Sequence, residues 1–170
     1  MDFFDVINAR RSVRKYTPER VGDKVLETIV AAGIEAPTGC NMQAKQYVIV
    51  NDPQVMAKIS PLTGAMDGAS AAIVLLIEPK GTKFGEFWMQ DASAAMENML
   101  LAAVAAGYAG CWIEGAVRPH EDQLREILAV PDHLRVWSLT PIGRPAALPQ
   151  RPPKPDLADI THRNGFGWRW

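Results

Sequence analysis

The sequence predicts one domain of the α/β or α+β class, with helices packed around a single sheet. Candidate strands alternate with candidate helices along the chain, an arrangement typical of these classes. The 170 residues suit one domain and are short for two. Hydrophobic residues make up 48% of the chain and charged residues 22%, so the protein can bury an ordinary globular core.

Helix signals dominate the first third of the chain. Asp23 is the expected N-cap of a helix that Gly33 closes, and Asp52 precedes Pro53 at the start of another. Small polar residues at 36–43 predict a loop. The expected elements here are helices at 2–9, 23–33 and 53–60 and a strand at 46–50.

An apolar run and a long amphipathic stretch mark the middle of the chain. The run 71–77 ends before Glu78-Pro79 and predicts a strand covered on both faces. The stretch 86–106 carries Met89 on its apolar stripe, and its many alanines permit close approach to a neighbouring helix or sheet. The expected elements are strands at 71–77, 109–113 and 136–142, a short connection at 81–85, and helices at 86–106 and 120–128.

The tail combines proline with aromatic residues. Prolines are dense from residue 145 to 155, which predicts an extended segment. Phe166, Trp168 and Trp170 follow near the end of the chain. We expect such an arm to pack onto another surface, and a partner subunit is the natural one.

Composition argues against several classes of protein. The formal net charge is −1, so nothing indicates nucleic acid or an anionic membrane as the main partner. The first residues carry no basic segment before an apolar run, and runs such as 99–106 are too short to cross a bilayer. We therefore expect a cytoplasmic protein.

Metal chemistry has no support in the sequence. Cys40 and Cys111 lie far apart, and the three histidines are widely spaced. Neither CxxC nor HExxH occurs, so a zinc or iron–sulfur site is not expected. The cysteines could form one disulfide or stay reduced, the favoured state for isolated thiols. Any redox chemistry must then depend on an organic cofactor.

A basic run follows the first expected helix. Arg10, Arg11, Arg14 and Lys15 bracket Ser12. They form either a solvated helix terminus or an anion site, because arginine forks and a hydroxyl grip phosphate oxygens. The sequence has no GxGxxG or Walker loop, so the second interpretation favours a compact phosphate ester held by side chains.

Two further segments have the chemistry to contact a ligand. Residues 36–43 are dense in short hydrogen-bonding side chains that can bind the edge of a planar heteroaromatic ring, although most such loops do no chemistry. Residues 110–115 end a predicted strand with glycine, which lets backbone amides approach a ligand closely. Trp112 taken alone is interpreted as core packing.

Together these segments resemble the nitroreductase family, in order and over nearly the whole chain. The resemblance implies an α+β fold with three α/β/α layers and a central, mostly antiparallel sheet. It also implies an intertwined homodimer, with one domain over 1–170 whose arm, from about 145 to 170, lies on the partner subunit. The similar segments are 10–14 with Tyr16 and Pro18, 36–43, 91–103, 110–115, 141–146 and 157–162.

The same resemblance implies FMN at the dimer interface, contacted by both subunits. By position, Arg10 and Ser12 resemble residues that hold the FMN phosphate, and Lys154 or Arg151 would complete that clamp. Arg14 resembles a cation near N1 and O2 of the flavin ring, where reduction places negative charge.

The flavin ring has further implied contacts. Residues 37–41 resemble the segment that the other subunit supplies, and the amides of Glu114 and Gly115 resemble those that face N5 and O4. The full set of expected cofactor-binding residues is Arg10, Arg11, Ser12, Arg14, Pro37, Thr38, Gly39, Asn41, Gln43, Trp112, Ile113, Glu114, Gly115, Arg144 and Lys154.

The implied reaction carries hydride from NAD(P)H through FMN to a nitroaromatic, a quinone or a similar acceptor by a ping-pong mechanism. No side chain is expected to act as a catalytic group, and Cys40 is interpreted as a small packing residue rather than a reactive thiol. Two alternatives are a specialised flavin-dependent dehydrogenase that NAD(P)H does not drive and a flavin-binding protein without turnover.

The sequence departs from the family pattern at several places. Ala44-Lys45 stand where many relatives have Pro-Trp, and Arg144 stands where an aromatic residue is common. Asp156 lies beside the expected phosphate clamp and would repel a phosphate if it pointed inward. The linker 79–85 is short, whereas many members insert helices there, so we expect an open pocket.

Overall fold

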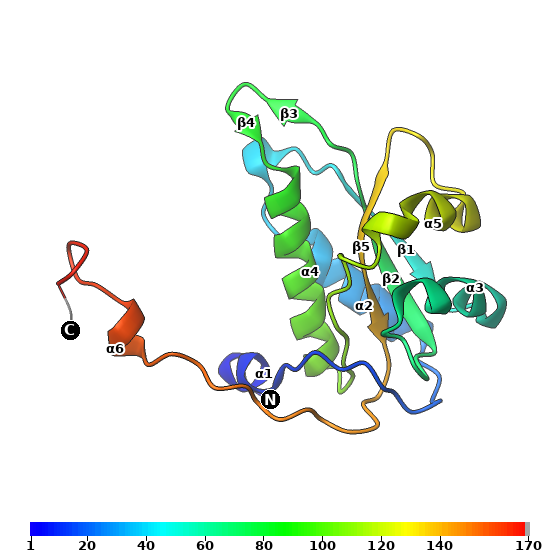
Figure 1. Ribbon diagram of the computed structural model, residues 1–170, viewed down its shortest axis with the longest axis horizontal. Coiled ribbons are helices and arrows are strands. Elements are labelled where there is room, and N and C mark those ends of the chain that lie inside the picture. The colour runs from blue at the N-terminus through cyan, green and yellow to red at the C-terminus, as the bar shows by residue number, and fades with distance from the viewer. Residues whose placement is uncertain (169–170) are drawn as a thin grey trace.

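The computed structural model describes residues 1–168, which form a layered body and a long C-terminal arm (Figure 1). The middle layer is an antiparallel sheet of three strands in the order β1–β2–β5. This pairing places the protein in the α+β class. The strands are β1 (Lys45–Val50), β2 (Ala71–Ile77) and β5 (Arg135–Ile142).

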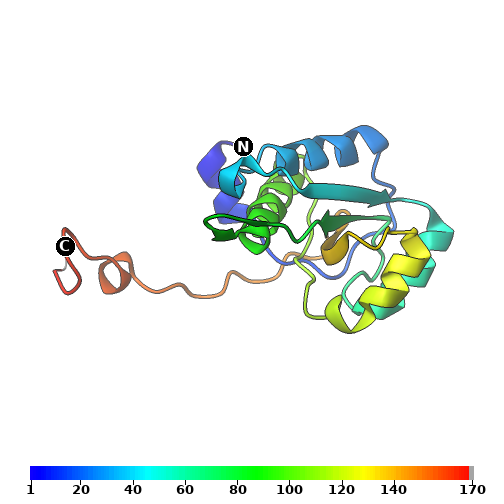
Figure 2. The same ribbon diagram turned by 90° about the horizontal axis from the view of Figure 1, so that it is seen from above.

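The central strand β2 organises both cores. All seven of its residues are buried, as the apolar run predicts. Alternate side chains face opposite layers: one set packs with α2 and α4, the other with α3 and α5. The helices are α1 (Phe3–Ala9), α2 (Asp23–Ile34), α3 (Pro53–Thr63), α4 (Trp88–Ala105), α5 (Glu121–Leu128) and α6 (Leu157–Ile160). The two helical layers on either side of the sheet are visible from above (Figure 2).

Local signals place most helix starts correctly. The carboxylate of Asp52 accepts hydrogen bonds from two backbone amides, at 2.8 and 3.0 Å, and caps α3 as expected. The predicted start of α2 is corrected by one residue, because Gly22 is the N-cap and Asp23 is the first residue of the helix. Helix α5 begins at Glu121, after a short 3₁₀ turn over Arg118–His120.

The strand predicted at 109–113 is wrong. These residues make isolated bridges to three separate partners, so no continuous ladder forms and no regular strand results. The bridges join Ala109 to Gly143, Gly110 to Ser12 and Ile113 to Leu139.

Two smaller differences concern the region before and within α4. The connection expected at 81–85 contains a short hairpin, β3 (Gly81–Thr82) with β4 (Gly85–Glu86). Met89, expected on the buried stripe of α4, is 41% exposed, so the buried face of this helix begins at Asp91 and Ala92.

The C-terminal segment leaves the body and extends away from it in both views (Figures 1 and 2). The proline-rich part from 147 to 156 contains no helix or strand, and α6 is a single turn. The apolar side chains of the arm are exposed, with Leu157 at 70% and Phe166 at 92%. Trp170, expected at the tip, lies outside the described residues.

Three observations bear on the other expectations from composition. Cys40 is exposed and Cys111 is buried, and both are free thiols. Within residues 1–168, no group of three or more His, Cys, Asp or Glu side chains is arranged to hold a metal ion. None of the helices in that range has the length and apolar character needed to span a bilayer.

Candidate functional site

A basic pocket lies where the segment after α1 meets the base of the arm. Its volume is about 390 Å³, within the range of small-molecule sites. Four cationic side chains line it together with Ser12, and none of the described residues that line it is acidic. The four cations are Arg10, Arg11, Arg151 and Lys154.

The body side of this pocket is held by short contacts. The Arg11 guanidinium donates to the carbonyl oxygens of Asn8 and Arg10, each at 2.7 Å. Arg10 Nε pairs with Glu97 Oε1 at 3.1 Å, which ties the pocket to α4. The arm side is extended backbone, so residues about 140 positions apart in the sequence come together. Such a cluster of fixed cations suits a phosphate group.

The glycine-ended segment 110–115 lies beside the basic run. Val13 N–H donates to the Gly110 carbonyl oxygen at 3.1 Å, and Gly110 cannot carry a side chain because a Cβ would lie 2.4 Å from Thr140 Oγ1. Ile113 exchanges two backbone hydrogen bonds of 2.9 Å with Leu139. After this anchor, neither the Glu114 nor the Gly115 amide donates a backbone hydrogen bond to any described residue. Two amides are therefore available to a ligand.

Two ionisable groups near Arg14 stay protonated at neutral pH. Burial raises the pKa of the Tyr16 phenol far above its ordinary value, and its hydroxyl donates to the Val13 carbonyl oxygen. Burial also raises the pKa of the Cys111 thiol, although the nearby Arg14 guanidinium acts in the opposite direction. Neither group is therefore poised as a base or nucleophile.

The loop 36–43 is strained. Cys40, Asn41 and Gln43 have φ angles of 51, 55 and 50°, a region that residues other than glycine rarely adopt. Gln43 N–H donates to Thr38 Oγ1 at 3.2 Å, and Gln43 Nε2 donates to Asn41 Oδ1 at 3.0 Å. Strain of this kind clusters at ligand sites, where surrounding contacts maintain it.

This loop and the basic pocket lie at opposite edges of the sheet. The loop leads into β1, beside the start of α4, whereas segment 110–115 is bridged to β5 (Figure 1). Within one chain, Ser12 of the pocket is bridged to Gly110, where the segment that leads to Glu114 and Gly115 begins. The chain does not bring Pro37, Thr38, Gly39, Asn41 and Gln43 to the same place.

Other expected residues are held elsewhere. The Arg144 guanidinium pairs with Glu19 at 2.7 Å and lies over the Tyr108 ring, outside the basic pocket. Trp112 packs against the core cluster of α2 and α4. Asp156 is exposed and is not among the residues that line the pocket.

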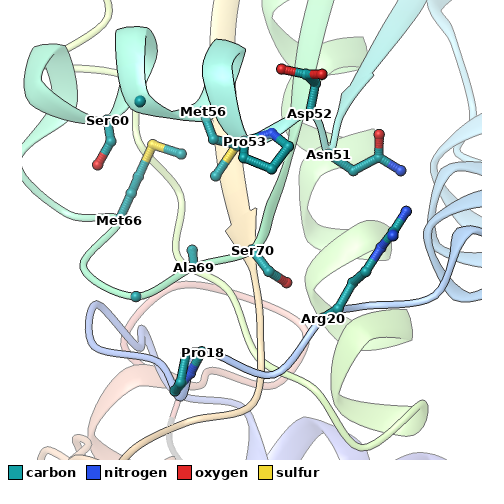
Figure 3. A pocket seen from close by; sticks show the side chains of 12 residues that line it. Pro18, Arg20, Asn51, Asp52, Pro53, Met56, Ser60, Met66, Ala69 and Ser70 are labelled. Atoms are coloured by element: carbon teal, nitrogen blue, oxygen red, sulfur yellow. The ribbon is translucent and has the colours of Figure 1, made fainter.

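A larger cavity, of about 680 Å³, is lined by none of the expected cofactor-binding residues (Figure 3). It lies between α3 and the loops before α2 and β2. Three of its polar side chains make contacts within the fold. Asp52 caps α3, and Asn51 Nδ2 donates to Asp23 Oδ1 at 2.7 Å. Ser70 Oγ accepts from the Val21 amide at 3.1 Å.

The structure adds two residues that sequence reasoning missed. Asp91 is only 5% exposed, and its Oδ1 accepts a hydrogen bond from the Gly39 amide at 2.8 Å. Lys45 Nζ donates to the Ala36 carbonyl oxygen at 2.8 Å. An acidic residue within the alanine-rich face of α4 was the available signal, since a buried carboxylate needs a partner.

Comparison with known proteins decides the family. The Nitroreductase family model matches residues 7–66 and 63–144, most of the chain. The chain belongs to the nitroreductase family. The resemblance in the sequence is thereby confirmed, and the β2-centred sheet is the nitroreductase fold.

Relatives of this nitroreductase-family chain match it over most of their length. It is 36% identical over 147 residues to an Archaeoglobus fulgidus protein proposed to be an NADH dehydrogenase/NAD(P)H nitroreductase, covering 82% of this chain and 83% of that one. It is 26% identical to the FMN reductase (NADPH) of Bacillus subtilis, and the match covers 95% of this chain and 73% of that protein. A crystal structure of a proposed NADH dehydrogenase/NAD(P)H nitroreductase from Bacteroides thetaiotaomicron superposes with a TM-score of 0.84 at 26% identity, covering 96% and 98%.

Proposed function

We propose that this chain passes electrons from NAD(P)H through FMN to a small acceptor, such as a nitroaromatic or a quinone, in two successive half-reactions. The coarser part follows from its relatives: the chain is an NAD(P)H-dependent flavin oxidoreductase with FMN as its cofactor. The acceptor and the ping-pong order are the proposal.

The basic pocket carries this proposal, together with the segment bridged to it at Gly110, which leads to the two free amides. Arg10 and Arg11 on the body side of the pocket, together with Lys154 or Arg151 on the arm, supply charge-assisted hydrogen bonds suited to the FMN phosphate. The neighbouring Glu114–Gly115 amides suit the polar edge of the flavin ring. Because the sequence lacks a glycine-rich phosphate loop, side chains must do the binding.

The residues of the chain would bind and orient the flavin and stabilise the charge that develops on it. Bound FMN supplies the hydride chemistry that links NAD(P)H to the acceptor. Arg14 is exposed next to Ser12, where its positive charge stabilises the negative charge that develops on the ring. Burial raises the pKa of Tyr16 and of Cys111, so both are poor proton donors at neutral pH, and solvent would supply the proton instead.

A homodimer completes the proposed site. Loop 37–43 lies at the sheet edge opposite the basic pocket, so a second copy is needed to bring it to the same flavin. Phe3 and Phe4 of α1 are exposed, and an apolar hollow next to them is lined by residues of α1, α2 and α4. This apolar surface and the unburied arm support an interface between two copies.

Flavin titration tests the cofactor site. We expect the purified protein to be yellow, to quench FMN fluorescence, and to bind FMN at least ~10-fold more tightly than riboflavin, which lacks the phosphate. A colourless protein that does not quench FMN would overturn the proposal. Equal affinity for FMN and riboflavin would show that the basic pocket does not bind the FMN phosphate.

Rapid mixing tests the two half-reactions. NADH or NADPH should bleach the flavin absorbance without an acceptor, and a nitroaromatic or quinone added afterwards should restore it. Bleaching by neither nicotinamide would leave the specialised dehydrogenase as the explanation. Bleaching that no acceptor reverses would leave a flavin-binding protein without turnover.

A further inference from the structure

A buried carboxylate in α4 holds the middle of the strained loop. Asp91 lies in the first turn of α4, 5% exposed among alanines, and accepts the Gly39 amide at 2.8 Å. Burying a carboxylate is costly unless it is hydrogen-bonded and paired. The Gly39 amide, the positive end of the α4 dipole and the nearby charge of Lys45 together offset that cost.

A lysine at the start of β1 holds the beginning of the same loop. Lys45 Nζ donates to the Ala36 carbonyl oxygen at 2.8 Å. Burial lowers the pKa of Lys45, and attraction to Asp91 opposes that lowering. The two side chains therefore act on the backbone at Ala36 and Gly39, from opposite ends of one short segment.

This segment needs such ties. Three of its residues after Gly39 have positive φ angles, which an untethered loop would relax. Gly39 itself lies tightly on the start of α4, because a Cβ there would be 2.4 Å from Phe87 Cβ. The side-chain hydrogen bonds within the loop are exposed, so they give weaker constraint than the contact with the buried Asp91.

We infer that Asp91 and Lys45 are positioning residues, which hold Pro37–Gln43 in the conformation that contacts the flavin ring of a partner subunit. Neither residue touches the flavin; both act through the loop backbone. The inference rests on the proposed function, because that proposal places the loop at the ring.

The first experiment measures the loop itself and needs no flavin. In Asp91→Ala and Lys45→Met, amide hydrogen exchange across 36–43 should become about 10-fold faster or more, since each removes a charge-assisted hydrogen bond. Asp91→Asn keeps an acceptor oxygen and should show a smaller change. Asp52→Ala and Lys58→Met are matched controls, which remove a helix cap and a surface charge away from the loop.

The second experiment measures the consequence for the ring. In Asp91→Ala and Lys45→Met, FMN and riboflavin affinities should fall by similar factors, roughly 10-fold, and the visible spectrum of bound flavin should shift. Lys154→Ala should weaken FMN alone, because it acts on the phosphate. A purely structural role for Asp91 would lower thermal stability and leave the spectrum of bound flavin unchanged.

The outcomes separate the two proposals. Unchanged exchange in both variants would overturn the positioning role. Faster exchange with unchanged flavin affinity and spectrum would overturn its connection to the ring. A wild-type protein that binds no flavin would overturn the proposed function, and the exchange data would still decide whether Asp91 and Lys45 hold the loop.

Discussion

The central strand of the body and the C-terminal arm differ in how far their apolar side chains are buried. In the body, every residue of β2 is buried between two helical layers. In the arm, Leu157, Ile160, Phe166 and Trp168 are exposed along a segment that leaves the body (Figure 2). The body buries the side chains of its central strand and leaves apolar surface exposed mainly around α1, whereas the arm buries none of these four side chains.

This difference in burial suggests that the body provides folding stability and that the arm would contribute to assembly. The cores that stabilise the sheet use only residues before Gly143, so the body has what it needs to fold alone. An exposed arm with aromatic residues gains stability only when another surface covers it. Between the two lies the base of the arm, which lines the basic pocket, so in the proposed dimer the arm would contribute to both assembly and cofactor binding.

Removing the arm is the strongest test of this comparison. Truncation after Pro155 should convert a dimer to monomers and release FMN, because buried aromatic anchors each contribute about 2 kcal/mol or more at an interface. Two such anchors correspond to a rise in the dimer dissociation constant of about 1,000-fold. Light scattering coupled to size exclusion measures the dimer, and flavin absorbance after desalting measures retention. A truncated protein that remains dimeric and yellow would refute the role given to the arm.

Matched leucines test the comparison inside the intact chain. Leu75→Ala removes a fully buried side chain from β2 and should lower the free energy of unfolding by about 3 kcal/mol. Leu157→Ala in the arm should change the body's unfolding by less than about 0.5 kcal/mol while weakening the dimer. Urea unfolding and sedimentation measure the two quantities. Equal losses of folding stability would show that the arm belongs to the folded body.

The body was largely predictable because its signals are local. The apolar run at 71–77 and the Asp52-Pro53 pair each mark an element within a few residues, and both elements form as expected. The 109–113 segment failed because its partners are Ser12, Gly143 and Leu139, on different parts of the chain. A composition typical of strands does not show whether a segment will pair with one continuous strand or, as here, bridge to several separate parts of the chain.

The grouping of Arg10 and Lys154 in one pocket was predictable only through family resemblance. Nothing local indicates that Arg10 and Lys154 line one pocket, since the extended chain places them far apart. Likewise, β1, α3, β2 and the β3–β4 hairpin separate Gly39 from Asp91 along the chain. The chemistry of the side chains predicted a phosphate-bearing ligand. Only the fold shows which of the charged side chains line the same pocket.

Lys154→Ala and Arg10→Ala compare the two sides of the basic pocket. Each should weaken FMN by about 10-fold and leave riboflavin unchanged, because a single charge-assisted hydrogen bond to the phosphate is lost. Arg10 also pairs with Glu97, so Arg10→Ala should slightly destabilise the body, whereas Lys154→Ala should not. Fluorescence titration with both flavins provides the measurement. An equal loss for riboflavin would place the pocket elsewhere than at the phosphate.

The smallest expected effect belongs to the body alone. Arg135 donates two hydrogen bonds of 2.6 Å to the Glu121 carboxylate, and these contacts lower the pKa of Glu121 below its usual range. A lowered carboxyl pKa contributes stability above the ordinary carboxyl pKa, and that contribution is lost as the pH falls through the folded-state pKa. Because the Arg135 side chain is half exposed, the contribution is at most about 1 kcal/mol.

Glu121→Gln isolates this contribution. The variant should be less stable than wild type at pH 7, and the difference should shrink steadily below about pH 4, where the wild-type carboxylate takes up its proton. Since Glu121 and Arg135 join α5 to β5 within the body, the same pH dependence should persist after truncation at Pro155. A difference that disappears with the arm would mean that assembly, rather than the body's own ion pair, sets the acid stability.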